Sequence, residues 1–427
     1  MDWRALRDAL IWRRTRIRRR WRPLAAYIWR RLLIRTTVIA VSGSVGKTTT
    51  KELLRTILED HAPTAWSPGN DNLRKFGSPE ATLLRARPRH QFIVVEAGVE
   101  RPGDMASVIK LLKPDIGVML DVKRCHTNTF KTIENLAAEK AELVRNLGAG
   151  SRVVLNLDNP HVAAMADAAP CEVIAFGSGT GARFRLLEAR SRWPERLTLL
   201  IQLDGARYEV KTRLVGVHWA TAVMAALTTA VVCGVPVEKA IAAIATVEPF
   251  WARMQPVALP GSGAVMIRDE WNGSVDTFEA AFKVMEEARA ERKIVVVSDY
   301  SDTPSKLRTR ANRLGRRGAE VADLLVFVGD YADRSVAAAV TDGFPQENAR
   351  SAESVQSAVA LLKSELRSGD LVLLKGQTSH HLSRIYLGLL GDIACSRMAC
   401  SRQILCDACE HLGLAVNQRS NGLVYCA

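Results

Sequence analysis

Residues 41–54 read VSGSVGKTTTKELL and combine a glycine-rich turn with the start of a helix. The apolar run TVIAV at 37–41 leads into the turn, which predicts a buried strand before it. Glycines let backbone amides turn toward phosphate oxygens, and a helix N-terminus adds its dipole. In such a loop the lysine reaches the β and γ phosphates, and the threonine after it ligates Mg²⁺. The predicted nucleotide-binding residues of the loop are Gly43, Ser44, Val45, Gly46, Lys47, Thr48 and Thr49.

The loop is shorter than the full GxxxxGK[ST] pattern, because Val41 stands where that pattern has its first glycine. Its position between a strand and a helix still indicates a nucleotide site. The loop alone fits ATP and GTP equally.

A second feature is the run FIVVE at 92–96, which predicts a buried strand that ends in a carboxylate. In open α/β sheets, ligands bind at the carboxyl ends of the strands. Glu96 is therefore predicted to hold or orient the metal ion of the nucleotide.

Short apolar runs alternate with helical stretches along most of the chain, which predicts an α/β fold. The alternation restarts near residue 250, so we expect a P-loop central domain with a mostly parallel sheet, followed by a smaller Rossmann-like α/β domain. The predicted strands include TVIAVSG, FIVVEAG, DIGVML and RVVLNLD in the first domain and KIVVVSD, LLVFVGD and DLVLLKG in the second. The expected divisions are a basic arm at 1–36, the central domain at 37–247, the C-terminal domain at 248–390 and a cysteine-rich tail at 391–427.

The arm carries most of the net charge of +14, because residues 1–36 hold twelve arginines against only Asp2 and Asp8. Apolar residues from Trp3 to Ile28 recur at helical spacing, which predicts an amphipathic helix. Such a helix could dock on the body, lie on an anionic membrane surface or bind nucleic acid. The aromatic residues on its apolar face favour the first two over nucleic acid. The arm shows no signal peptide, so we expect a cytoplasmic protein that is peripheral at the inner face of the membrane.

The tail contains Cys395, Cys400, Cys406 and Cys409. This spacing permits four thiolates around Zn²⁺, and CxxC is a common half-site. A helical hairpin with buried cysteines would show similar spacing. Both interpretations stand at this point.

An ordered set of motifs between about residues 37 and 390 resembles the Mur ligases, which form amide bonds with ATP. The resemblance is nearest to the type that adds D-alanyl-D-alanine to a UDP-N-acetylmuramoyl-tripeptide. The motifs are SGSVGKTTTKELL, GNDNLRKFGSPEATLL, VVEAGVERPGDM, PDIGVMLDVKRCHTNTF, AAEKAEL, VLNLDNP, GVHWATAVMAAL, EPFWARMQPV, RDEWNGSVDTFEAA and GDLVLLKGQTS.

The resemblance implies roles for residues across the chain. Lys47 and Thr48 would serve the phosphates of ATP and the first Mg²⁺, and Glu96 and His126 would lie at the metal and the γ-phosphate. Lys140 matches a family lysine that is carbamylated and helps to bind a second Mg²⁺. The remaining implied positions are Asn156, His218, Asp269 and Asn272 near the nucleotide, Arg253 as a γ-phosphate clamp, and Lys375 and Ser379 facing the incoming amine.

The implied reaction joins a small-molecule carboxylate to an amine through an acyl phosphate. The sequence departs from the family in three places. Only the arginine-rich arm stands where these ligases have their UDP-sugar-binding domain. Trp219 and Ala222 replace two asparagines of the motif on the adenine side, and Ser274 replaces a further asparagine in the run DEWNGSVD. Two other functions fit the residues, namely a polyglutamate-type ligase acting on folate or a polymer, and a P-loop NTPase stimulated by nucleic acid.

Overall fold

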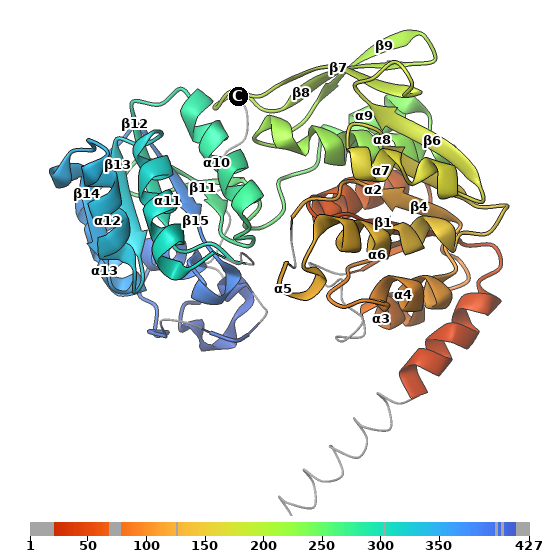
Figure 1. The fold of residues 1–427 in the computed structure, drawn as a ribbon, viewed down its shortest axis with the longest axis horizontal. Coiled ribbons are helices and arrows are strands. Elements are labelled where there is room, and N and C mark those ends of the chain that lie inside the picture. Colours follow the sequence, from red (N-terminus) through yellow and green to blue (C-terminus); the bar gives the residue numbers. More distant parts are fainter. Residues whose placement is uncertain are drawn as a thin grey trace, which may run out of the picture.

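The computed structural model describes residues 21–67, 78–124, 127–301, 305–397, 400–402 and 405–415. It contains two sheets, each covered by helices, which lie side by side in Figure 1. This confirms the predicted α/β class, with the larger, mostly parallel sheet first. The division of the chain at residues 247 and 248 stays a prediction.

The first sheet has nine strands in the order β2-β3-β1-β4-β5-β6-β7-β8-β9. The strands from β2 to β7 pair in parallel, and β7, β8 and β9 pair antiparallel. The strands are β1 (Thr37–Ser42), β2 (Thr64–Trp66), β3 (Phe92–Glu96), β4 (Ile116–Met119), β5 (Arg152–Asn156), β6 (Glu172–Gly177), β7 (Phe184–Arg190), β8 (Thr198–Leu203) and β9 (Ala206–Lys211).

Both faces of this sheet are buried. In β1, Ile39 and Val41 pack into one apolar core, and Val38 and Ala40 pack into another on the opposite face. Side chains alternate across a strand, so a strand buried on both sides must be apolar throughout. The first face is covered by α2 (Lys47–His61), α8 (Ala220–Val232) and α9 (Val237–Ile244), and the other by α3 (Ser78–Arg85), α4 (Asp104–Leu112), α6 (Ile133–Arg145) and α7 (Pro160–Ala163), with the short α5 (Thr127–Phe130) leading into α6.

The second sheet has six strands in the order β10-β11-β15-β12-β13-β14, parallel except for the β10–β11 pair. The order reverses beside β15, as in Rossmann-like sheets, where ligands bind at such a reversal. The strands are β10 (Gln255–Ala258), β11 (Val265–Asp269), β12 (Arg292–Val297), β13 (Leu324–Val328), β14 (Ala349–Ala352) and β15 (Asp370–Lys375). The helices are α10 (Val275–Glu287), α11 (Leu307–Ala319), α12 (Ala332–Thr341), α13 (Val355–Glu365) and α14 (Ser383–Leu390).

A helix over residues 21–32 precedes β1 and projects from the edge of the first domain, which it contacts through Trp29 and Arg30 near its C-terminal end (Figure 1). It is the described part of the predicted basic arm, and residues 1–20 lie outside the described residues. Within the described ranges, no helix is both long enough and apolar enough to cross a membrane.

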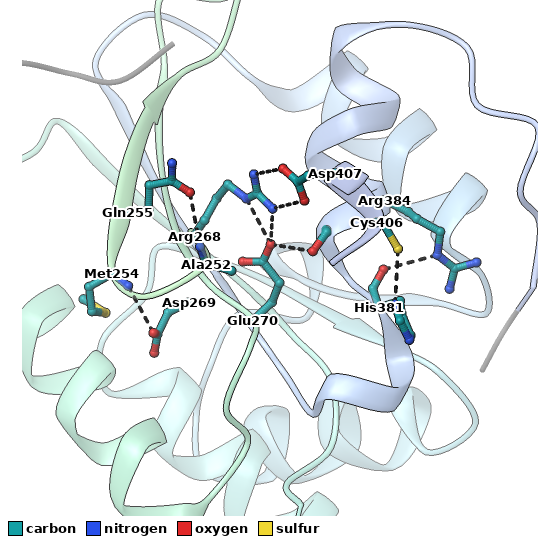
Figure 2. A network of polar contacts seen from close by, with 11 residues as sticks. Ala252, Met254, Gln255, Arg268, Asp269, Glu270, His381, Arg384, Cys406 and Asp407 are labelled. Atoms are coloured by element: carbon teal, nitrogen blue, oxygen red, sulfur yellow. Dashed lines mark hydrogen bonds and ion pairs between the residues drawn. The ribbon is translucent and has the colours of Figure 1, made fainter. Parts of the chain in front are cut away.

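The described part of the cysteine-rich tail packs on the second domain through a buried ion pair. Arg268 in β11 donates to both carboxylate oxygens of Asp407, at 2.7 and 2.9 Å, and to Glu270 at 2.6 Å. Ser383 of α14 donates to the same Glu270 oxygen at 2.8 Å. Figure 2 shows the Arg268 guanidinium between the two carboxylates.

The structure does not support the zinc prediction for this tail. Cys406 is buried with its Sγ 3.2 Å from Nδ1 of His381, and the guanidinium of Arg384 lies 3.7 Å from Sγ of Cys395. A cation beside a thiol opposes the binding of a second cation. Among the described residues, which include all four cysteines, no group of three or more His, Cys, Asp or Glu side chains is placed to hold a metal ion.

Replacing Asp407 with alanine is expected to lower the free energy of unfolding by about 1–3 kcal/mol, because it removes the acceptor of Nη1 of the buried Arg268 guanidinium while the pair with Glu270 remains. Urea unfolding followed by circular dichroism measures the change. The matched control is Arg402→Gln in the same tail, which breaks the exposed Arg402–Glu410 pair and should change stability by less than about 1 kcal/mol. Equal effects of the two substitutions would contradict the structural role of Asp407.

Candidate active site

The candidate site forms where β1, β3 and β4 end beside one another. These strands are adjacent and parallel, so Ser42, Glu96 and Met119 lie at the same edge of the sheet. The loop after β1 turns sharply there. Gly43 has φ +154°, and a Cβ on it would come within 2.8 Å of Cβ of Leu120, so the turn requires glycine at this position.

The loop has the predicted position and leads directly into α2, with Gly46 at the N-cap in a left-handed conformation. Lys47 folds back on the loop, and its Nζ donates to the carbonyls of Gly43 at 2.9 Å and Ser44 at 3.3 Å. The loop and the first residues of α2 line a pocket of the cleft, so the N-terminus of the helix lies where its dipole favours a phosphate.

Asp121 is a functional residue that the sequence analysis missed. Its Oδ1 accepts hydrogen bonds from the backbone N–H of Ser44 at 2.8 Å and of Val45 at 2.9 Å. The carboxylate therefore fixes the first half of the loop. A sequence signal was present, because Asp121 follows the apolar run of β4 just as Glu96 ends the apolar run of β3.

The predicted metal ligands Thr48 and Glu96 lie together and are both buried. Oγ1 of Thr48 donates to the Glu96 carboxylate, 3.0 Å from Oε2 and 3.2 Å from Oε1. The backbone N–H of Glu96 donates to Oγ of Ser67 at 2.9 Å, which orients the end of β3. A hydroxyl beside a carboxylate offers the oxygen ligands that Mg²⁺ prefers, so these two residues fit the ion.

Lys140 lies behind the loop. Its side chain is buried, and its Nζ donates to the Gly43 carbonyl at 2.9 Å. The ammonium group thus reaches the loop backbone from α6, and the carbamate role of Lys140 stays a prediction. His126, the other predicted residue of this part, lies outside the described residues.

Two pockets share the cleft between the domains. The first, of about 630 Å³ including open solvent, is lined by Val45 and Gly46 of the loop, by His218 and Trp219, and by Arg253. Asp269 and Asn272 line it from the second domain. The second pocket, of about 930 Å³, extends past Lys47, Thr48 and Glu96. The cleft thus has a partly apolar end with Trp219 and Ala222, and a polar end at the loop.

Arg253 is one of the residues that line both pockets. It lies between Ala252 and Met254, which both have left-handed backbone conformations, with φ of 53° and 49°. Burial lowers the pKa of the Arg253 guanidinium, while the charges of Asp269 and Glu96 oppose that shift. Because arginine stays protonated even so, a partly buried positive charge lines the phosphate end of the cleft.

Two predicted residues contact the protein itself at the edge of the cleft, and their expected roles toward the substrates stay predictions. Asn156 is buried, and its Nδ2 donates to the Leu120 carbonyl at 2.8 Å, so it supports the strand end beneath Asp121. Lys375 is fully buried, and its expected role toward the incoming amine stays a prediction. Its Nζ lies 2.7 Å from Oδ2 of Asp269 and donates to the carbonyl of Asn272 at 2.6 Å. Ser379, its expected companion, is exposed.

A third pocket, of about 970 Å³, lies in the second domain at the carboxyl ends of β12 and β13. Asp299, Arg310, Asp330 and His380 give it charges of both signs. Arg310 donates to Oδ1 of Asp299 at 3.0 Å. The segment after β12 separates this pocket from the cleft, because Asp299 lines one and Ser301 lines the other.

A phosphate loop, an oxygen-ligand pair for Mg²⁺ and a cleft between two α/β domains define a P-loop enzyme that acts on a nucleotide. The Mur ligase middle domain model matches residues 41–230, and the Mur ligase glutamate ligase domain model matches residues 252–378. The chain belongs to the Mur ligase family and is an ATP-dependent enzyme of the kind that forms amide bonds.

Curated relatives agree with this assignment. The chain is 29% identical over 384 residues to the UDP-N-acetylmuramoyl-tripeptide–D-alanyl-D-alanine ligase of Mycobacterium bovis, a match that covers 84% of this chain and 74% of the relative. It is 26% identical over 357 residues to the ligase of the same name from Synechocystis, covering 83% and 75%.

Solved structures show the same fold. MurF from Acinetobacter baumannii superposes with a TM-score of 0.78 at 22% identity, covering 86% of this chain and 79% of the other. MurF from Thermotoga maritima, solved in complex with ADP, superposes with a TM-score of 0.73 at 22% identity, covering 84% and 81%.

His218 provides a pH test of the cleft. Burial, with the charges of Lys375 and Lys123, lowers its pKa from 6.5 to about 3. The unfolded chain therefore binds a proton between these two values that the folded protein does not, so acid favours unfolding in that window. Between pH 7 and pH 5 this group alone should remove about 2 kcal/mol of stability. Between pH 7 and pH 5 the free energy of unfolding of His218→Asn should therefore fall by about 2 kcal/mol less than that of the parent protein. Urea unfolding at both pH values measures the two falls. An unchanged fall would show that His218 titrates normally.

Proposed function

We propose that the chain joins the carboxylate of a cell-wall peptide precursor to the amine of a short peptide, with ATP converted to ADP and phosphate. The arrangement of Lys47, Thr48 and Glu96 at a cleft lined from both domains carries this proposal. Support for the substrate class comes from the curated relatives, whose names specify a UDP-N-acetylmuramoyl-tripeptide and D-alanyl-D-alanine.

The reaction has two steps. A carboxylate oxygen attacks the γ-phosphorus of ATP and ADP leaves, which gives an acyl phosphate. The amine nitrogen then attacks the acyl carbon, inorganic phosphate leaves, and the nitrogen loses a proton as the amide forms. Bringing a carboxylate to ATP is opposed by charge repulsion. Lys47 and Arg253 would offset that repulsion from opposite sides of the cleft. Mg²⁺ held by Thr48 and Glu96 would neutralise further phosphate charge.

The third pocket supplies a place for the amine substrate. A short peptide at neutral pH carries an ammonium group at one end and a carboxylate at the other. The Asp330 carboxylate would bind the ammonium group, and the Asp299–Arg310 ion pair presents one charge of each sign at the same pocket. Because the segment 298–301 lines both this pocket and the cleft, an amine held here would lie next to the site where the acyl phosphate forms.

Two other functions lack such support. A polyglutamate-type ligase uses the same chemistry and differs only in its substrates. A nucleic-acid-stimulated NTPase would need no carboxylate and no amine, and it would not account for the match of both domains to the ligase family.

A screen of ADP formation separates these functions. The full chain is incubated with Mg·ATP and pairs drawn from UDP-muramoyl peptides, folate, amino acids and dipeptides, with duplex DNA and RNA as separate additions. The proposal expects ADP only when a UDP-muramoyl peptide and a dipeptide are both present. ADP formed with folate and glutamate would favour the polyglutamate ligase, and ADP formed with nucleic acid alone would contradict a ligase.

Lys140→Ala is expected to abolish ADP formation while the far-ultraviolet circular dichroism stays unchanged, because the carbamate that the family resemblance implies at Lys140 is lost. Partial rescue by a small added carboxylate such as acetate would indicate that the missing group is an anion. Lys140→Arg is the matched control: it keeps a cation that could reach the Gly43 carbonyl but cannot be carbamylated. If Lys140→Arg retains full activity, the lysine acts as a cation that supports the loop and the carbamate assignment is wrong.

A further inference from the structure

The helix over residues 21–32 has two apolar faces, and only one of them packs on the protein. On the inner face Ala26 and Leu33 are buried. Nε1 of Trp29 donates to the carbonyl of Ala86 at 3.1 Å. Arg30 is buried as well, and it donates to the carbonyls of Leu112 at 2.6 Å and Lys113 at 2.7 Å. These contacts fix the orientation of the helix on the first domain.

The outer face carries a row of large apolar side chains that remain in solvent. Trp21, Leu24, Ile28 and Leu32 recur at spacings of three and four residues, so they form one stripe along the helix. Trp21 is 61% exposed, Leu32 62%, and Ile34, just beyond the helix, 84%. These five residues supply most of the large exposed apolar side chains in the described ranges, which also include Tyr27 on the same helix. Such a concentration marks a binding surface.

Arginines lie next to the stripe along the chain and on a neighbouring segment of the first domain. Arg22, Arg31 and Arg35 lie on the helix or directly after it. The contact between Trp29 and Ala86 brings the segment 85–89 beside the helix, and this segment presents exposed Arg85, Arg87 and Arg89. Residues 1–20, which join the helix at Trp21, add eight arginines against two aspartates.

We propose that this surface, formed by the outer face of the helix and the arginines of segment 85–89, binds an anionic lipid bilayer. An apolar stripe bordered by arginines is the pattern of a helix that lies in the membrane interface. There the apolar side chains enter the acyl boundary, and the arginines contact anionic headgroups. Because the inner face is fixed to the first domain, the helix holds the enzyme against the lipid surface. This attachment is independent of the proposed reaction and uses none of the residues of the cleft.

Charge argues against two other occupants of the surface. A second copy of the chain would bring the same arginines together, and like charges across an interface oppose association. Nucleic acid would satisfy the arginines, but it offers no partner for Leu24, Ile28 and Leu32, which would remain in solvent. A bilayer with acidic headgroups matches the charged and the apolar parts of the surface at once.

Vesicle flotation with the full chain tests the proposal. The protein is mixed with vesicles of phosphatidylcholine alone or of phosphatidylcholine with phosphatidylglycerol, and the bound fraction is measured at low and high NaCl. Binding is expected on the anionic vesicles and should weaken at high salt. The triple variant Leu24→Asp, Ile28→Asp, Leu32→Asp should reduce partitioning by about tenfold or more, because it removes the apolar stripe and adds repulsion.

Two further variants act as controls. Leu24→Ile, Ile28→Leu, Leu32→Ile keeps the stripe apolar and should bind like the parent. Arg85→Gln, Arg87→Gln, Arg89→Gln keeps the stripe and should weaken binding to anionic vesicles only. All of the substituted positions are exposed, and Arg87 also donates to the carbonyls of Leu84 and Ala86. Unchanged thermal unfolding shows that each variant is folded.

Three results would overturn the proposal. The first is equal binding of the parent and the triple aspartate variant to anionic vesicles. The second is a parent dimer in light scattering that the aspartate variant dissociates, which would make the outer face an interface between two copies. The third is salt-sensitive binding to a DNA duplex that the aspartate variant retains, with no binding to vesicles.

Discussion

The backbone of residues 43–45 is held by charged side chains from three separate elements, and the candidate site depends on this arrangement. The Gly43 carbonyl accepts from Lys47 of α2 and from Lys140 of α6, and the amides of Ser44 and Val45 donate to Asp121 after β4. These elements meet only because β1 lies directly beside β4 in the sheet. The shape of the phosphate loop is therefore a property of the whole first domain rather than of the glycine-rich segment alone.

This dependence explains which parts of the site could be predicted from the sequence. Loop position follows from local chemistry, because glycines between a strand and a helix have few other uses at that spacing. The Thr48–Glu96 pair was also predictable, since Glu96 ends an apolar strand at the ligand edge of a parallel sheet. Asp121 satisfies the same rule. The family resemblance assigns a role in this segment to His126, which lies outside the described residues. It assigns none to Asp121, whose carboxylate contacts the loop.

Contacts between residues that are distant in the sequence could not be predicted from the residues around each partner. Arg268 and Asp407 are separated by 139 residues, and nothing in either segment indicates that they pair. The family resemblance implied that Lys375 faces the incoming amine, but nothing in the sequence around it indicated that its amine pairs with Asp269. The cysteines of the tail suggested a metal site by spacing alone. Spacing describes only the chain around the cysteines, while the position of the tail depends on Arg268 in another element and on Arg384 in α14.

The backbone conformation on either side of Arg253 also depends on contacts with residues distant in the sequence. A non-glycine residue in the left-handed region costs of order 1–3 kcal/mol, and here two of them flank one arginine. Hydrogen bonds fix both: the Ala252 N–H donates to Oε1 of Gln255 at 3.2 Å, and the Met254 N–H donates to Oδ1 of Asp269 at 3.1 Å. Asp269 is held in turn by Lys375. The residues that hold this strained backbone thus belong to the second domain. The guanidinium of Arg253, which they orient, faces the phosphate loop of the first domain. A movement of the second domain would therefore carry Arg253 with it, which links closure of the cleft to delivery of positive charge where the phosphate is transferred.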